Sequence, residues 1–172
     1  MSAVEVSTHV QAVVDHLNDA ELEDDWYEGA ILFGRGRQPD GTGWQGTPTQ
    51  SPFRGYGIVW RIGSKDSRNL SLDDDAGTEA RPLIYVRVFG GFPTQADDIL
   101  DLAHARMMDG TFSVPGRRLV KGSLHLDNGQ TSTKTEDVEY TLFEAGNFYR
   151  FRTVPLTSGY GIDPYGTSGF GG

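Results

Sequence analysis

The sequence predicts an α+β domain in which a mainly antiparallel sheet of about five to six strands packs against two helices. Two segments, about 4–22 and 94–109, repeat apolar residues at helical spacing. The other apolar segments are short, and several alternate between unlike side chains, as half-buried strands do. A series of such strands around one central helix, with another helix before it, favours this fold class.

The first helix is expected on one apolar stripe: Val6, Val10, Val13, Val14 and Leu17. It should end near the acidic run 21–25, because carboxylates at a helix C-terminus oppose the helix dipole.

Six segments are expected to form strands: 29–34, 56–63, 83–89, 118–127, 137–143 and 147–154. Turn residues at 127–129 and 145–147 are expected to separate the last three. Two long polar segments, 34–55 and 64–81, are expected to be loops, and loops of this length are typically functional or mobile.

The junction between the strand at 83–89 and the second helix contains a double glycine that could bind a phosphate. It lacks the GxGxxG and GxxxxGK[ST] spacings, and Asp97 and Asp98 in the first helical turn would repel a phosphate. We expect Thr94 to be the N-cap, with Asp97 three positions later, and Gly110 to be the C-cap. The junction is therefore predicted to be structural.

Composition narrows the possible functions. A formal charge of −9 and a pI near 4.8 argue against broad contact with nucleic-acid backbones. The absence of cysteine excludes disulfides, thiolate metal sites and a cysteine nucleophile. The N-terminal segment has no basic region before an apolar run, and no run approaches the length of a membrane helix, so we expect a soluble protein made in a cytoplasm.

No catalytic, metal or cofactor site is predicted. His9 and His16 are seven residues apart, too far for one metal ion without a third ligand, so the histidines are expected at the surface or in packing. The run 73–75 lacks the spacing of a calcium loop. No GxSxG motif is present, and the sequence therefore predicts a protein that is not an enzyme.

Four arginines lie within predicted strands and are the candidate interface charges: Arg61, Arg87, Arg150 and Arg152. A mid-strand arginine must be solvated, paired with an acid or placed at an interface. Their aromatic neighbours Tyr85, Phe89, Tyr149 and Phe151 favour an interface, because they exceed what one small core needs.

Residues 1–156 are expected to form the single domain, and residues 157–172 an extended tail rich in glycine and aromatic residues. Tyr160, Tyr165 and Phe170 recur five apart among the glycines. Such a tail is either disordered in the free monomer or anchored by these rings on a neighbour in an assembly.

The chain resembles the tail terminator proteins of long-tailed bacteriophages, particularly those that infect actinobacteria. The segments that carry the resemblance are VQAVVDHL, YGIVWRIG, YVRVFGGFPTQADDILDLAHARMMDG, VPGRRLVKGSLHLDNG and NFYRFRTVPL, which together cover most of residues 4–156. The strand–glycine–TQAD–helix piece is the most specific of them, and it is a packing signature without catalytic residues.

The resemblance implies an α+β subunit that forms a homo-oligomeric ring, hexameric in that family. Such a ring caps the tail tube at the head-proximal end of the virion, stops its polymerisation and joins it to the neck. The implied partners are other copies of the chain, the tail tube protein and a neck or head-completion protein, after assembly in the host cytoplasm. DNA passes through the lumen of such a ring without sequence-specific binding, and no cofactor or membrane is involved.

The loops 34–55 and 64–81 are then candidates for contacts along the tube axis. Three alternatives remain open from the sequence. They are another head–tail joining protein, a tail tube protein that polymerises openly, and a small hydrolase or nuclease.

Overall fold

The computed structural model describes residues 2–47, 51–62, 79–109, 111–136 and 141–156. The helices are α1 (Ser2–Asp19) and α3 (Pro93–Met108). The strands are β1 (Leu32–Arg35), β2 (Gly43–Trp44), β3 (Phe53–Arg54), β4 (Tyr56–Arg61), β5 (Leu83–Gly90), β6 (Arg117–Leu119), β7 (His125–Glu136), β8 (Thr141–Arg150) and β9 (Thr153–Pro155).

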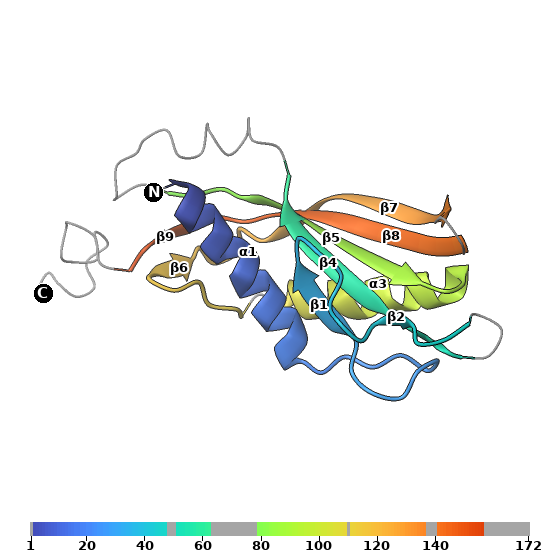
Figure 1. Ribbon diagram of the computed structural model, residues 1–172. Helices are drawn as coiled ribbons and strands as arrows, with labels where there is room; N and C mark the ends of the chain where they lie inside the picture. The colour runs from blue at the N-terminus through green and yellow to red at the C-terminus, as the bar shows by residue number, and fades with distance from the viewer. Residues whose placement is uncertain (1, 48–50, 63–78, 110, 137–140, 157–172) are drawn as a thin grey trace, which may run out of the picture.

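The predicted fold class is confirmed. Five strands form one sheet in the order β1-β4-β5-β8-β7. All its neighbours are antiparallel except β1 and β4, which are parallel. Both helices pack on the same side of this sheet, with α1 crossing its β1 end and α3 lying under β5 and β8 (Figure 1). Short pairs β2·β3 and β6·β9 extend from it.

The main core lies between this side of the sheet and the two helices. Ile84, Val86 and Val88 of β5 are completely buried there, as the alternation of the strand predicts. The helices contribute a matching apolar stripe: Val10, Val13, Val14, Leu17, Ile99, Leu100, Ala103 and Met107. Each fully buried aliphatic side chain of this kind contributes about 1.5–3 kcal/mol to folding.

The strand boundaries in the last third of the chain differ from the prediction. The expected strand 118–127 is two strands, β6 and the start of β7, joined by a turn in which Gly122 has a φ of 77°. The expected turns are wrong, because 127–129 lies within β7 near a register shift and 145–147 lies in the middle of β8. Glycine is needed at position 146, in the middle of β8, because the ring of Tyr85 on β5 lies against it.

The expected loop 34–55 contains the β2·β3 hairpin, which the glycines and prolines concealed. Of the other expected loop, residues 64–78 lie outside the described residues, as do residues 157–172 of the predicted tail. Ala80 is described and forms a bridge with Thr153.

Helix α3 begins differently from the expectation. Pro93 occupies the first turn, and the N-cap is Phe92, with no side-chain cap, so the assignment of Thr94 as N-cap was wrong. Gln95 instead ties the start of the helix to the preceding turn and to β3: its Oε1 accepts a hydrogen bond from Gly91 N–H at 2.9 Å, and its Nε2 donates to Phe53 O at 3.0 Å. Pro93 lacks a donor and presets the helical φ, so the helix can start directly after the strand.

His9 and His16 are buried, His104 is half-buried, and His125 is exposed. His9 is completely buried and its Nε2 is hydrogen-bonded to Thr153 Oγ1 at 2.6 Å, which ties α1 to β9. His104 Nδ1 lies 2.7 Å from the hydroxyl of Tyr149, which is also completely buried. Among the residues that the structure describes, no cluster of three potential metal ligands occurs.

The ends of α1 and α3 are joined by reciprocal hydrogen bonds. His16 Nε2 donates to Arg106 O at 2.8 Å, and Arg106 Nε donates to His16 O at 2.9 Å. Asp109, the C-cap of α3, accepts from Arg106 Nη1 at 2.9 Å and lies 3.2 Å from His16 Nε2. Gly110, the expected C-cap, lies outside the described residues.

The pKa of Asp109 reflects this network. Burial acts to raise it, but hydrogen bonds from Thr111 N–H and Oγ1 and the charges of His16 and Arg106 outweigh burial and hold the pKa below the ordinary value of 3.8. A carboxyl group whose pKa is lowered by folding stabilises the folded state above its unfolded pKa.

We therefore predict that Asp109→Asn lowers the free energy of unfolding at pH 7. The difference from the wild type should shrink as the pH falls below about 5, through the ordinary aspartate value, and vanish below the lowered pKa of the folded state. Urea titrations at several pH values measure it. Asp101→Asn, at an exposed position of the same helix, is the matched control. A difference in unfolding free energy that stays constant down to pH 2 would contradict a lowered pKa of Asp109 in the folded state.

Candidate interface on the open face of the sheet

The face of the sheet opposite the helices, here called the outer face, carries a layer of aromatic and charged side chains. No helix among the described residues packs on it. Alternation along the strands places these side chains together: Tyr56, Ile58, Trp60, Tyr85, Arg87, Phe89, Leu142, Glu144, Phe148 and Arg150.

At one end of the outer face, strand register brings three rings into a row. Trp60 pairs with Tyr85, and Tyr85 pairs with Phe148. The Tyr85 and Phe148 rings stack with centroids 4.3 Å apart, while Trp60 meets Tyr85 edge-on at 5.1 Å. Aromatic pairs of this geometry contribute about 0.5–1.5 kcal/mol beyond the area they bury.

At the other end, the β2·β3 hairpin covers the outer face. Tyr56 stacks on Phe89 with centroids 4.9 Å apart. Phe53 of the hairpin lies against Tyr56, and Trp44 meets Phe53 edge-on at 5.0 Å. These residues form a second apolar cluster, separate from the main core.

An ion pair between Arg87 and Glu144 lies between the two aromatic groups. The guanidinium also lies over the Phe89 ring, 4.9 Å from its centroid. The side chains are 27% and 18% exposed, so the pair is partly removed from water. Arg87 Nε has no hydrogen-bond partner, and Glu144 Oε2 makes its ionic contact without hydrogen-bond alignment. A partly desolvated pair with unsatisfied atoms is costly unless a partner completes it.

Gly146 allows the ring of Tyr85 to lie flat on the sheet. A Cβ at this position would meet Tyr85 Cε1 at 2.4 Å. Burial raises the pKa of the Tyr85 hydroxyl, and the nearby positive charge of Arg87 offsets part of that rise. The hydroxyl is therefore neutral at physiological pH.

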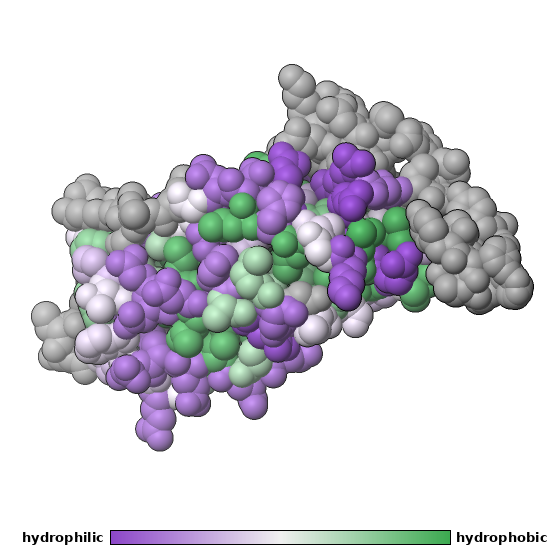
Figure 2. Space-filling model, turned by 180° about the vertical axis from the view of Figure 1, so that it is seen from behind, coloured by the Kyte–Doolittle hydropathy of each residue, from purple (hydrophilic) through white to green (hydrophobic). Residues whose placement is uncertain are grey.

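The outer face remains partly accessible. Ile58, Trp60, Leu142 and Phe148 are half-buried. Viewed from behind, the molecule shows hydrophobic residues among hydrophilic ones across the middle of its surface (Figure 2). An aromatic surface surrounded by polar residues is typical of a protein–protein contact.

The structure places the four predicted arginines in different surroundings. Arg87 and Arg150 share the outer face, and Arg150 Nε donates to Asp127 Oδ1 at 3.3 Å. Arg152 lies beyond β8, where its Nη1 donates to Glu79 Oε2 at 3.1 Å. Arg61 is half-buried at the end of β4, in register with Ile84 of the helix-covered face.

Two of the aromatic neighbours do not belong to an interface. Tyr149 and Phe151 are 0% and 1% exposed and pack in the main core, which corrects the expectation. Tyr160, Tyr165 and Phe170 lie outside the described residues. Glu144 and Phe148 could not be assigned to the outer face from sequence, because their positions depend on the register of β8 against β5.

Comparison with known protein families found no matching family model, and comparison with curated proteins found no match either. Among the described residues, no helix is long and apolar enough to cross a membrane.

We predict that Gly146→Ala destabilises the fold by about 1–3 kcal/mol, because the added methyl group displaces the Tyr85 ring. Urea unfolding measures the change. Gly46→Ala is the control, since its Cβ would lie 3.5 Å from Ser51, an ordinary contact, and should change stability by less than about 0.5 kcal/mol. Equal effects of the two substitutions would show that the ring does not lie against Gly146.

A double-mutant cycle tests the ion pair. We expect Arg87→Met and Glu144→Gln each to destabilise the protein, and the double variant to lose less than their sum, with a coupling of about 1–2 kcal/mol. Denaturant titrations of the four proteins give the coupling. A value near zero would mean that the contact contributes nothing to stability.

Proposed function

We propose that the protein is a structural subunit that assembles into a closed ring, and that it acts as the tail terminator of a long-tailed bacteriophage. The observation that carries the proposal is the outer face. It is an aromatic and charged sheet surface that no described helix covers. The resemblance of the sequence to tail terminators supports the choice of this assembly over other oligomers.

The outer face has the chemistry of a lateral contact between subunits. Tyr and Trp rings supply apolar area, and Arg87, between the two aromatic groups, supplies directional charge. Tyrosine, tryptophan and arginine are the residues in which binding energy concentrates. A neighbouring subunit could supply the hydrogen bonds that Arg87 and Glu144 lack.

The edge strand β7 adds a second element to this contact. Among the described residues β7 pairs with β8 alone, so no described strand occupies its other edge. A ring requires two unlike surfaces that fit head to tail, and its rotation determines closure. In this proposal, the outer face with its adjacent β7 edge forms one of these surfaces.

The net charge of −9 also suits such a subunit, because mutual repulsion keeps free copies soluble until they meet the tube end. The proposal includes no catalytic step and no cofactor. Its partners are further copies of the chain, the tail tube protein and a neck protein.

The mass of the purified protein in solution, alone and with its tail tube protein, tests the proposal. We expect a closed oligomer of one size, or a monomer that forms a ring only at tube ends. Open-ended polymerisation of the purified chain would contradict the proposal and indicate a tube protein. Binding to a portal-side complex without binding to tube ends would contradict it in favour of another neck component.

The double variant Trp60→Lys/Phe148→Lys places two charges on the half-buried rings of the outer face. We expect it to weaken ring formation by at least about tenfold, because each lysine must be desolvated at the contact. Met108→Lys is the matched control, an exposed apolar residue at the end of α3. Circular dichroism verifies the fold of both variants. A folded double variant that assembles as the wild type does would exclude the outer face as the contact.

A further inference from the structure

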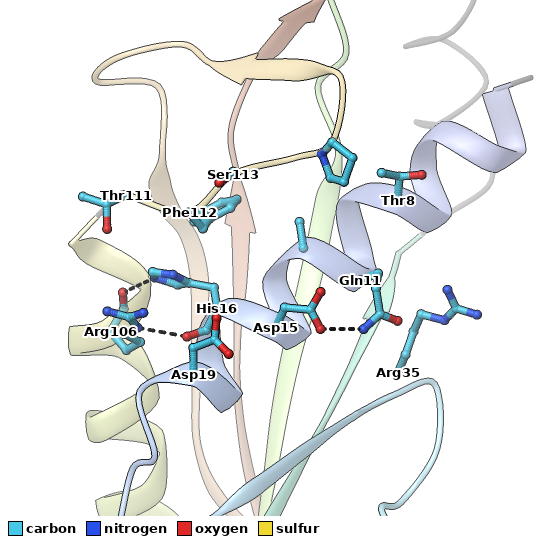
Figure 3. Close-up of a pocket in the computed structure, with 12 residues that line it drawn as sticks. Thr8, Gln11, Asp15, His16, Asp19, Arg35, Arg106, Thr111, Phe112 and Ser113 are labelled. Carbon is cyan, nitrogen blue, oxygen red and sulfur yellow. Dashed lines mark hydrogen bonds between the residues drawn. The ribbon is translucent and has the colours of Figure 1, made fainter.

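A groove runs along α1 on the helix side of the molecule and has a volume of about 910 Å³ (Figure 3). We call it the α1 groove. It is bounded by α1, the end of α3, the segment 111–115 and Arg35 of β1. Its lining residues from α1 are Thr8, Gln11, Ala12, Asp15, His16 and Asp19.

The α1 residues follow helical spacing, so they form one continuous stripe along the groove. From Thr8 to Asp19 the helix rises by about 17 Å at 1.5 Å per residue. Gln11 and Asp15 lie at its middle, where Gln11 Nε2 donates to Asp15 Oδ1 at 2.8 Å (Figure 3). The groove therefore follows the length of this stripe, and that length fits an extended peptide.

The floor of the groove is apolar and its sides are polar. Ala12, His16 and Phe112 are 5–6% exposed and form the floor, and the exposed ring of Pro115 stands at one side. Hydroxyl, amide and carboxylate groups on both sides can bond to peptide N–H and C=O groups. This combination binds extended peptides with ring-bearing side chains.

The described chain ends beside this groove. Leu156 N–H donates to Gly116 O at 3.0 Å, immediately after Pro115 of the groove wall. The side chain of Leu156 is 62% exposed. The segment 157–172 therefore starts at the groove and needs no long linker to reach it.

The sequence of this segment matches the groove in length and chemistry. Tyr160 and Tyr165 are five residues apart, which is about 17 Å in an extended chain at 3.3 Å per residue. The same distance separates the two ends of the α1 stripe. Gly159, Gly161 and Gly166 flank the tyrosines and allow the backbone to approach the helix closely. From Leu156 to Tyr160, an extended chain spans about 13 Å.

We infer that residues 157–172 bind in the α1 groove of the same chain, with Tyr160 and Tyr165 held at its two ends. Phe170 lies five residues beyond Tyr165, outside the length of the groove. This contact is independent of ring formation, since it uses the helix side of the molecule and not the outer face.

Hydrogen exchange of the full-length chain tests the inference. We expect Tyr160→Ser/Tyr165→Ser to speed amide exchange in 111–116 by about tenfold, because the bound segment shields this side of the groove. Exchange in β5, on the far side of the core, should not change. Phe170→Ser is the matched control and should exchange as the wild type does. Unchanged exchange at 111–116 in the double variant would overturn the inference.

A groove variant tests the same contact from the other side. Ala12→Arg fills the floor with a charged side chain, and we expect chymotrypsin to cleave after Tyr160 and Tyr165 about tenfold faster than in the wild type. Asp97→Arg, at an exposed position of α3, is the control for added charge. Circular dichroism verifies that both variants are folded. Equal cleavage of the wild type and Ala12→Arg would overturn the inference.

Dilution distinguishes binding within one chain from exchange between copies. Protection at 111–116 should be independent of protein concentration when the segment binds its own chain. Protection that appears only as the protein oligomerises would overturn binding within the chain and place the segment in a neighbour's groove.

Discussion

Strand β5 is apolar on both of its faces, and the rest of the structure depends on this. Ile84, Val86 and Val88 face the helices, whereas Tyr85 and Phe89 face the other way, with Arg87 between them. A central strand of this composition needs a cover on each side of the sheet. The two helices cover one side. On the other side, the sheet covers itself with rings that lie flat on one another and with a short hairpin at one end. Because no described helix adds to this cover, the outer face is the preferred candidate for contact with another subunit.

The fold class and the two faces of β4 and β5 follow from the sequence because alternation is a local property. The register of β8 is not local. Glycine and asparagine at 146 and 147 indicate a turn when they are taken alone, yet the structure uses Gly146 to admit the Tyr85 ring and buries Asn147, which donates to Tyr149 Oη. The ring that explains Gly146 lies 61 positions earlier in the chain, and the pairing of β8 with β5 fixes the burial of Asn147, so no local pattern contains either.

The same difference between local pattern and tertiary register applies to the candidate interface. Arg87 could be selected from the sequence because an arginine in an apolar strand is unusual. Glu144 could not, since its position diagonal to Arg87 depends on the pairing of Phe89 with Glu144. Arg61 and Arg152 are also arginines in predicted strands, as Arg87 is. They lie outside the outer face, because Arg61 is at the end of β4 and Arg152 lies beyond the end of β8. Side-chain type identified candidates, and tertiary register decided which of them came together.

The bond between His9 and Thr153 joins residues 144 positions apart, and the bridge from Ala80 to Thr153 meets it at the same place. Its consequence concerns synthesis of the chain. The first helix leaves the ribosome long before the strand against which its buried histidine packs. Until β9 has emerged, the apolar stripe of α1 lacks part of its final cover, and the nascent chain depends on late, long-range contacts to close the domain. Folding of this subunit is therefore expected to be completed only after β9 has emerged.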